Sequence, residues 1–472
     1  MHLVAIGGSD AGISAALRAR ELDPSTEVTV VVADAYPNFS ICGIPYYVSG
    51  EVTHWTNLAH RTIADLKAAG MSLRLDTTAR RIDVGDHQLV VAGPGGDEEL
   101  LAYDVLMVGT GAVSVRPPIE GLTGADALGA PDGVHLLHSM GDTFEVMATL
   151  ENTVPQSALI VGAGYIGLEM AEALVARGLS VTQVEQLPEV LPTVDPQLGA
   201  LVHHQLTEHG VEVLCRTAVT RIVRAPRGSS GRIQVNGTDP TGEIARFADV
   251  VLVVVGVRPD TQLAVSAGAN LGAQGAIEVD RQMRTNLPDV WAAGDCVATY
   301  HRLLGMTYLP LGTTAHKQGR VAGENALGGR REFAGSLGTQ VVKVFDSVVA
   351  RTGLRDHEAV SAGFDPVTIE HQADDHKAYY PGSHRIRMRY TGDRQTGRLL
   401  GVQLFGHRHA EVAKRIDIAA VSIFHGMTVD GISDLDLSYT PPLGSPWDAV
   451  QAGAQTWVRE ANSPGGSPPP TA

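Results

Sequence analysis

The chain has 472 residues, enough for two to four domains that each bury a core of their own. An apolar fraction of 44% is typical of a globular protein, and a net charge of −16 argues against nucleic acid or an anionic membrane as the main partner. Three cysteines are too few for a disulfide framework, no apolar run approaches the ~20 residues that cross a bilayer, and the N-terminus lacks the pattern of a signal peptide. We therefore expect a cytoplasmic protein.

The first predicted unit is a strand, a helix and a strand, over residues 3–6, 11–22 and 28–32. A glycine-rich turn between the first strand and the helix is a place for the pyrophosphate of a dinucleotide. Ser9 stands where the middle glycine of such a turn would be, and Asp34 either binds a ribose or starts a loop. The residues assigned to this nucleotide site are Gly7, Gly8, Ser9, Ala11, Gly12 and Asp34.

A second unit repeats the pattern, with a strand over 158–161, a helix to about residue 176 and a strand over 181–185. Its turn carries all three glycines of a dinucleotide-binding motif and therefore indicates a second site. Glu185 ends the following strand, where a carboxylate accepts hydrogen bonds from both ribose hydroxyls and repels a 2′-phosphate. This favours NADH. The residues assigned to this site are Gly162, Gly164, Tyr165, Ile166, Gly167 and Glu185.

Three further strands end in residues suited to cofactor binding. Residues 103–111 predict a strand that leads into a turn with Thr110 and Gly111, and residues 249–256 a central strand that ends at Gly256. A strand over 290–295 ends at Asp295, which either holds the ribityl chain of a flavin or caps the segment that follows. From about residue 338 the pattern is β-rich with one helix over 410–425, and the tail 461–472 is of low complexity, which predicts disorder.

Cys42 follows the first glycine-rich turn by about one Rossmann unit, where a flavin ring can lie against its sulfur. No second cysteine stands nearby, so its redox partner is the flavin, a sulfenic acid or a substrate thiol. A helix that begins near residues 44–45 would lower the pKa of its thiol. The alternative is a buried, inert cysteine, and that interpretation fits Cys215 and Cys296.

Polar and aromatic residues elsewhere are less specific. Tyr379, Tyr380 and Tyr439 lie in stretches rich in proline and glycine, where they either donate hydrogen bonds to sulfur or oxygen or pack at an interface. The 18 histidines show no metal-ligand spacing, and His203 and His204 resemble exposed polar residues, so no metal is predicted.

Together these residues resemble the FAD-dependent pyridine nucleotide-disulfide oxidoreductases, in particular the single-cysteine branch of coenzyme A-disulfide reductases, NADH oxidases and persulfide reductases. The resemblance runs from Leu3 to about Trp457. It rests on the cysteine segment 42–47, the turn 109–111, residues 256–261, the flavin motif 293–296, and the C-terminal segments 379–382, 414–417 and 438–442.

The resemblance implies an α/β fold with two Rossmann-like domains and an α+β dimerisation domain. Its expected boundaries are 1–118 with 282–330 for FAD, 119–281 for NAD(P)H and 331–460 for dimerisation. It implies FAD and NADH (or NADPH) as cofactors and a homodimer in which Tyr439, with Tyr380, completes the active site of the partner subunit. The expected reaction is reduction of a low-molecular-weight disulfide of the coenzyme A disulfide or persulfide type through Cys42.

Three departures from the family pattern bear on the substrate. Asp10 replaces a histidine of peroxidase relatives, Glu21 replaces the second arginine of an Arg-Arg pair, and Pro446-Trp447 replaces a small residue and a lysine. The alternatives are an NADH oxidase that reduces oxygen through a cysteine sulfenic acid, NADH-dependent electron transfer to a small protein carrier, and a redox-sensing flavoprotein.

Overall fold

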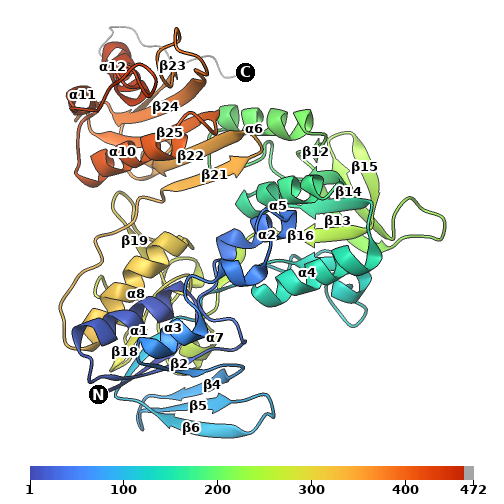
Figure 1. The fold of residues 1–472 in the computed structure, drawn as a ribbon, viewed down its shortest axis with the longest axis vertical. Coiled ribbons are helices and arrows are strands. Elements are labelled where there is room, and N and C mark those ends of the chain that lie inside the picture. The colour runs from blue at the N-terminus through green and yellow to red at the C-terminus, as the bar shows by residue number, and fades with distance from the viewer. Residues whose placement is uncertain (462–472) are drawn as a thin grey trace. The chain divides into compact units, whose positions relative to one another are not determined.

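The computed structural model describes residues 1–461, which form two compact units (Figure 1). Unit 1 comprises Met1–Pro155 and Val250–Ser336, and unit 2 comprises Gln156–Asp249 and the described residues from Leu337 on. The predicted disordered tail lies, from residue 462, outside the described residues, and the three-domain boundaries stay predictions. Among residues 1–461, no helix combines the length and apolar character needed to span a lipid bilayer.

Unit 1 is built on a parallel sheet of five strands in the order β18-β7-β1-β2-β3. Its strands are short apolar runs, and β1 and β7 are almost entirely buried, as expected for strands covered on both faces. The carboxyl ends of β1, β7 and β18 therefore meet at one edge, where the first glycine-rich turn lies. The strands are β1 (His2–Ile6), β2 (Glu27–Val31), β3 (Met71–Arg74), β7 (Val105–Val108) and β18 (Val290–Ala292).

Helix α1 (Asp10–Leu22) lies beside helix α8 (Gly312–Ala326), as Figure 1 shows. Small residues allow this close contact: a Cβ on Gly319 would lie 2.3 Å from the carbonyl oxygen of Ala11, and one on Gly323 would lie 2.3 Å from that of Ala15. Larger side chains would push α8 away. The contact thus fixes the start of α1, and with it the first glycine-rich turn, against a second helix.

The other elements of unit 1 form smaller sheets and helices around this core. One antiparallel sheet has three strands, and three further strand pairs are β8–β17, β9–β16 and β19–β20. The elements are α2 (Ile44–Ser49), α3 (Ile63–Ala68), β4 (Thr78–Asp83), β5 (Gln88–Ala92), β6 (Glu98–Ala102), β8 (Ala112–Ser114), β9 (Val134–Leu136), α4 (Met140–Thr153), β16 (Val250–Val253), β17 (Val257–Pro259), α7 (Gln262–Ser266), β19 (Thr299–His301) and β20 (Gly305–Thr307).

Unit 2 begins with the second glycine-rich turn, between a parallel strand and its helix. Strands β10, β11 and β12 are parallel neighbours, and β13, β14 and β15 form an antiparallel sheet. The elements are β10 (Ser157–Val161), α5 (Tyr165–Ala176), β11 (Ser180–Val184), α6 (Pro196–Glu208), β12 (Glu212–Leu214), β13 (Ala218–Arg224), β14 (Ile233–Asp239) and β15 (Gly242–Ala248). The predicted end of α5 at residue 176 is confirmed.

The rest of unit 2 is an antiparallel sheet in the order β21-β22-β25-β24-β23, with helices α10, α11 and α12 beside it (Figure 1). Glu172 of α5 pairs with Lys343 and accepts the N–H of Phe345 at 2.8 Å, which attaches β21 to the Rossmann-like part. The elements are β21 (Gln340–Val344), β22 (Ser347–Gly353), α9 (Asp356–Ser361), β23 (Pro366–Asp374), β24 (Arg385–Asp393), β25 (Leu399–His407), α10 (Val412–Phe424), α11 (Val429–Ser433) and α12 (Ala449–Ala461).

The prediction of a single helix after residue 338 is incomplete, because α9, α11 and α12 are also present. Helix α12 is held by tertiary contacts that could not be predicted from its own sequence. The Trp457 indole donates to the carbonyl of Val367 at 2.8 Å, and the Tyr390 hydroxyl donates to that of Val450 at 2.8 Å. A helix rich in alanine, glycine and glutamine forms here because the sheet supplies its apolar partner.

Candidate active site

The two glycine-rich turns share one local geometry. In the first, a Cβ on Gly12 would lie 2.1 Å from the carbonyl oxygen of Gly7, and in the second a Cβ on Gly167 would lie 2.2 Å from that of Gly162. Only glycine fits at such a distance, so each helix begins tightly against its turn. The N–H groups of the first helical turn then remain available to a phosphate.

The middle position of each turn is open, which is what the approach of a pyrophosphate requires. A Cβ on Gly164 would meet nothing within 4 Å, and Ser9 is exposed with a side chain that makes no capping hydrogen bond. Close to the first turn, the side-chain amide of Asn38 is buried and has no hydrogen-bond partner among residues 1–461. An unsatisfied buried amide beside an open glycine-rich turn fits a ligand with several acceptors, such as FAD.

Cys42 lies in a short turn of 3₁₀-helix (Ile41–Gly43) and is exposed. Helix α2 starts at Ile44, so the prediction of a helix near residues 44–45 is confirmed. The segment before the cysteine is bound to the first glycine-rich turn, because the N–H of Asn38 donates to the carbonyl of Gly8 at 2.6 Å. Backbone bonding therefore holds the cysteine segment against the turn predicted to bind the dinucleotide.

Four aromatic rings pack around this segment, and sequence reasoning missed them. Tyr36 contacts Phe39, Trp55 and Phe144 edge-on, with ring centroids 5.1 to 6.1 Å apart, and Phe39 stacks on Trp55 at 5.5 Å. Aromatic pairs of this kind add to the stability of a loop beyond the area they bury. The pair Tyr36 and Phe39 was visible in the sequence, but its partner on α4 could only be found in the fold.

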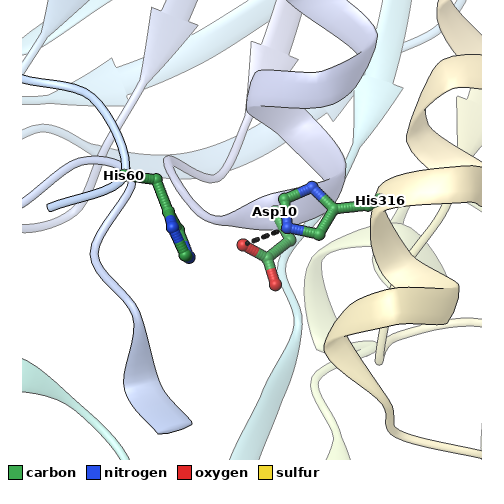
Figure 2. A group of neighbouring side chains, drawn as sticks. All are labelled: Asp10, His60 and His316. Atoms are coloured by element: carbon green, nitrogen blue, oxygen red, sulfur yellow. Dashed lines mark ion pairs between the residues drawn. The ribbon is translucent and has the colours of Figure 1, made fainter. Parts of the chain in front are cut away.

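Asp10, the first residue of α1, forms a small polar cluster with two histidines (Figure 2). Its carboxylate pairs with His316 of α8 at 3.3 Å, and the other ring nitrogen of His316 bonds to the Ser14 hydroxyl at 2.9 Å. The ring of His60 lies 6.0 Å from that of His316, centroid to centroid. Burial raises the pKa of Asp10, while the charges of His316 and His60 oppose the rise. The departure at position 10 thus places a paired acid at the edge of the predicted FAD site.

Asp295 follows strand β18, and no helix follows it: the next element is β19. The interpretation of Asp295 as a helix cap is therefore wrong, and its role toward a flavin stays a prediction. Burial, followed by the nearby charge of Asp10, raises the pKa of the Asp295 carboxyl to about 6. The hydroxyl of Tyr308 donates to its carbonyl at 3.0 Å, which fixes the backbone at this point.

We expect Asp295→Asn to stabilise the protein more at pH 7.5 than at pH 5. A carboxyl whose pKa is raised by folding favours the folded state below its unfolded value, near 3.8, and loses that contribution as the pH rises through about 6. Asparagine removes the ionisation, so the stability that the substitution adds is greater at pH 7.5 than at pH 5 by about 1.4 kcal/mol. Thermal unfolding midpoints of both forms at the two pH values measure it. An equal difference in unfolding midpoint between the two forms at both pH values would contradict a raised pKa of Asp295.

The remaining residues assigned to the first site lie near the turn, with structural partners of their own. The Thr110 hydroxyl donates to the carbonyl of Asp260 at 2.5 Å, and the N–H of Asp260 donates to Gly111 at 3.0 Å. Ala11 is buried, and the exposed Asp34 accepts the N–H of Tyr36 at 2.9 Å. Asp34 thus forms a loop-starting turn and stays exposed to solvent, so both of its predicted roles remain.

Glu185 lies one residue beyond β11 and is buried. Its carboxylate accepts the N–H of Ala163, inside the second glycine-rich turn, at 2.8 Å, and the N–H of Leu187 at 2.9 Å. The acid is thus fixed beside the turn, as a ribose-binding carboxylate requires. Each oxygen keeps a second lone pair for a ribose hydroxyl.

Tyr165 and Ile166 begin helix α5 at the second turn. The Tyr165 hydroxyl bonds to Gln340 and accepts the Thr193 hydroxyl at 3.0 Å. Its side chain therefore packs toward β21, and its part in dinucleotide binding stays a prediction. Gly256 is exposed and has a left-handed backbone, and a Cβ at this position would meet nothing within 4 Å.

The two tyrosine segments of the C-terminal region lie together in unit 2. The N–H of Lys377 donates to the carbonyl of Pro441 at 3.3 Å, and that of Tyr380 donates to Lys377 at 2.8 Å. Tyr380 and Tyr439 are both about 45% exposed. Desolvation and the neighbouring Tyr379 raise the pKa of Tyr439, so its hydroxyl keeps its proton at neutral pH. The two predicted tyrosines thus lie on adjacent segments, and both are accessible.

A buried ion pair supports these segments. Arg415 of α10 donates to both oxygens of Asp448 at 2.9 to 3.3 Å, and to the carbonyl of Asp375 at 2.7 Å. The side chains of Arg415 and Asp448 are only 6% and 14% exposed. The Arg415 guanidinium therefore joins Asp375, which precedes Tyr380 in the chain, to Asp448, which follows Tyr439.

Of the other two cysteines, Cys296 is buried as predicted, whereas Cys215 is only half-buried. Cys296 is fully buried, and burial raises its pKa to about 11. Cys215 is half-buried, and burial together with the charge of Glu189 raises its pKa to about 12. Protonated thiols are weak nucleophiles. Among the cysteines of residues 1–461, the exposed Cys42 is therefore the best candidate nucleophile.

Comparisons with known proteins agree with this architecture. The family described as pyridine nucleotide-disulphide oxidoreductase matches residues 1–319, and its dimerisation domain matches residues 339–449. The chain is 34% identical to an NAD(P)H sulfur oxidoreductase (CoA-dependent) of Pyrococcus furiosus, over 95% of this chain and 97% of that one. It is 30% identical to an NADH oxidase of Methanocaldococcus jannaschii, over 98% and 100%.

A solved structure of an NAD-dependent persulfide reductase from A. fulgidus has a TM-score of 0.89 and 36% identity, and the match covers 98% of this chain and 83% of that one. The chain belongs to the pyridine nucleotide-disulphide oxidoreductase family. It is an oxidoreductase with two Rossmann-like parts and a C-terminal dimerisation domain, and the cofactors of the family are FAD and NAD(P)H.

Proposed function

We propose that the chain catalyses the NADH-dependent reduction of a low-molecular-weight disulfide, of the coenzyme A disulfide or persulfide type, through Cys42. The observation that carries this proposal is the backbone bond from Asn38 to Gly8, at 2.6 Å, which holds the segment of an exposed cysteine against the first dinucleotide turn. A redox-active cysteine needs this combination of access and proximity to a flavin. The reducing cytoplasm is the compartment that suits such a cysteine.

The reaction balances with one redox cysteine. Bound at the first glycine-rich turn, FAD would supply two electrons taken as a hydride from NAD(P)H. These electrons break a mixed disulfide between Cys42 and a substrate thiol, which leaves the Cys42 thiolate and releases the thiol after protonation. The thiolate then attacks a new disulfide, so that an S–S bond to Cys42 forms as the substrate S–S bond breaks. The leaving thiolate takes a proton.

We assign the delivery of that proton to Tyr439, with Tyr380 on the adjacent segment. The raised pKa of Tyr439 keeps its hydroxyl protonated and able to donate at neutral pH. In a homodimer formed through the family's dimerisation domain, we place these tyrosines at the active site of the partner subunit. The exposure of both side chains supports a role at such a surface.

The substrate class is supported by the P. furiosus relative, which is named CoA-dependent, and the charges around Glu21 are compatible with it. At this position the family's coenzyme A reductases tend to carry an arginine, and an acid would oppose the phosphates of coenzyme A. In this chain Glu21 pairs with Arg18 at 3.0 Å and with Arg320 at 3.3 Å. Its negative charge is therefore compensated, and the substitution does not exclude a phosphorylated thiol.

We expect NADH to be preferred to NADPH by a factor of about 10 to 100 in kcat/KM. Glu185 is held beside the second turn by the N–H of Ala163, and a 2′-phosphate there meets a fixed carboxylate. Like charges at close range in a partly buried site cost on the order of 1–3 kcal/mol. Steady-state rates with each nucleotide measure the ratio. Equal values would show that Glu185 does not face the ribose.

A second candidate is an NADH oxidase that reduces oxygen through a sulfenic acid on Cys42. It is favoured by the 30% identity with the M. jannaschii NADH oxidase. Electron transfer to a small protein carrier, with Cys42 a bystander, is a third candidate without such an observation.

One substrate panel separates these functions. NADH consumption by the purified, FAD-loaded protein is followed with coenzyme A disulfide under argon, with oxygen alone, and with neither. Fast anaerobic turnover that needs the disulfide supports the proposal. Oxygen-dependent turnover of equal or greater rate would assign the oxidase function, and no turnover with either acceptor would favour a protein carrier.

A further inference from the structure

Three side chains with metal-binding atoms converge in unit 2, away from Cys42 in the chain. The Nδ1 of His203 lies 2.9 Å from the Oε1 of Glu189, and the Sγ of Cys215 lies 3.7 Å from that oxygen and 3.9 Å from that nitrogen. All three side chains are half-buried. Thiolate, imidazole and carboxylate are the three ligand types that zinc takes from proteins.

The three residues come from separate elements that the fold holds together. Glu189 follows β11, His203 lies on α6, and Cys215 follows β12. A Cβ on Gly199, one helical turn before His203, would lie 2.6 Å from the carbonyl oxygen of Val190 and 2.8 Å from the Cγ of Glu189. Glycine at this position lets α6 approach the loop closely enough for the imidazole to meet the carboxylate.

The distances between the donor atoms match those around one tetrahedral ion. Bond lengths of about 2.3 Å to sulfur and about 2.0 Å to nitrogen and oxygen place sulfur about 3.6 Å from each of the other two donors, which lie about 3.3 Å apart. The observed separations of 3.7, 3.9 and 2.9 Å differ from these by less than about half an ångström. Side-chain rotation alone can supply such a change.

We propose that Glu189, His203 and Cys215 form a binding site for zinc or a similar thiophilic divalent cation. Three protein ligands leave a fourth position for water, so the ion is exchangeable. Coordination replaces the proton of the Cys215 thiol, which is released to solvent, and uses the neutral imidazole. Sulfur in the ligand set selects zinc or cobalt over magnesium and calcium.

The site lies at the loop that carries the predicted ribose-binding acid. The N–H of Arg216 donates to the carbonyl of Leu187 at 2.9 Å, and the N–H of Thr217 donates to that of Glu185 at 2.9 Å. A cation held by Glu189 and Cys215 therefore bridges the two strands of chain that fix Glu185. The cluster of Asp10, His60 and His316 is a separate candidate and belongs to the predicted FAD site.

Cobalt substitution tests the proposal on the full, FAD-loaded chain. After removal of metals with a chelator, cobalt is titrated in, and difference spectra are recorded at wavelengths beyond the flavin absorption, where tetrahedral cobalt absorbs. We expect one cobalt per chain, displaced by zinc. Flavin absorbance and circular dichroism confirm that each variant is folded.

The chain offers matched controls. Cys215→Ser and His203→Gln are expected to weaken cobalt binding about tenfold or more, and to remove the tetrahedral bands. His204→Gln, on the same helix but paired with Glu208, and Cys42→Ser are expected to leave both unchanged. His316→Asn is expected to have no effect either. Bands that persist in Cys215→Ser, that disappear in Cys42→Ser or His316→Asn, or that never appear would overturn the proposal.

Discussion

Cys42→Ser is expected to reduce the rate of disulfide reduction by about a thousandfold or more, while FAD stays bound and is still reduced by NADH. Serine is nearly isosteric with cysteine, but its hydroxyl is not ionised at neutral pH and cannot form an S–S bond. The exchange step therefore stops. Hydride transfer from the nicotinamide does not involve the sulfur, so reduction of the flavin continues.

Rapid mixing of NADH with the oxidised variant, and steady-state turnover with coenzyme A disulfide, measure the two steps separately. Cys215→Ser, compared with wild type after metals are removed with a chelator, serves as the matched control, since its thiol is held protonated by burial. Wild-type protein partly reduced with NADH is expected to show a long-wavelength thiolate-to-flavin band that the Cys42 variant lacks. Turnover of the disulfide at the wild-type rate would show that Cys42 is structural.

Arg415→Met is expected to lower the free energy of unfolding by about 3 kcal/mol and to reduce disulfide turnover with it. The substitution leaves the Asp448 carboxylate, only 14% exposed, without its cation, and leaves the carbonyl of Asp375 without a donor. Both losses fall on the chain that carries the tyrosine segments. Denaturant midpoints, followed by circular dichroism and by flavin fluorescence, measure the change.

The double variant Arg415→Met with Asp448→Leu is the control, because replacing a buried pair by apolar side chains removes the unpaired charge. We expect it to recover most of the stability. Lys414→Met, at the neighbouring exposed position on α10, is expected to change the midpoint by less than about 0.5 kcal/mol. A double variant as unstable as Arg415→Met would show that the two side chains stabilise the fold by their packing and not by balancing a buried charge.

The Rossmann-like parts could be predicted from the sequence because their signals are local. The turn around Gly162 lies between a buried strand and a helix whose end at residue 176 is as expected. The position of Glu185 follows from the same spacing, one residue beyond β11. Glycines, strand length and a terminal acid all fall within one continuous stretch, so no long-range contact is needed to recognise them.

The parts that were missed depend on contacts between distant residues. Helix α12 is held by Val367 and Tyr390 of the sheet, and these partners cannot be read from its own sequence. Phe144 joins the aromatic group near Cys42 from another element. His203 was interpreted as an exposed polar residue, but it pairs with Glu189 beside Cys215. Ligands that lie so far apart in the chain have no spacing that a motif could reveal.

Mass spectrometry of the Cys42 peptide tests the central claim most directly. The oxidised protein is incubated anaerobically with coenzyme A disulfide, freed of excess ligand, and analysed before and after one equivalent of NADH. We predict one coenzyme A per chain, joined to Cys42 by a disulfide and released by the NADH. A protein that acquires no adduct at Cys42, or keeps it after NADH has reduced the flavin, would contradict the proposed function.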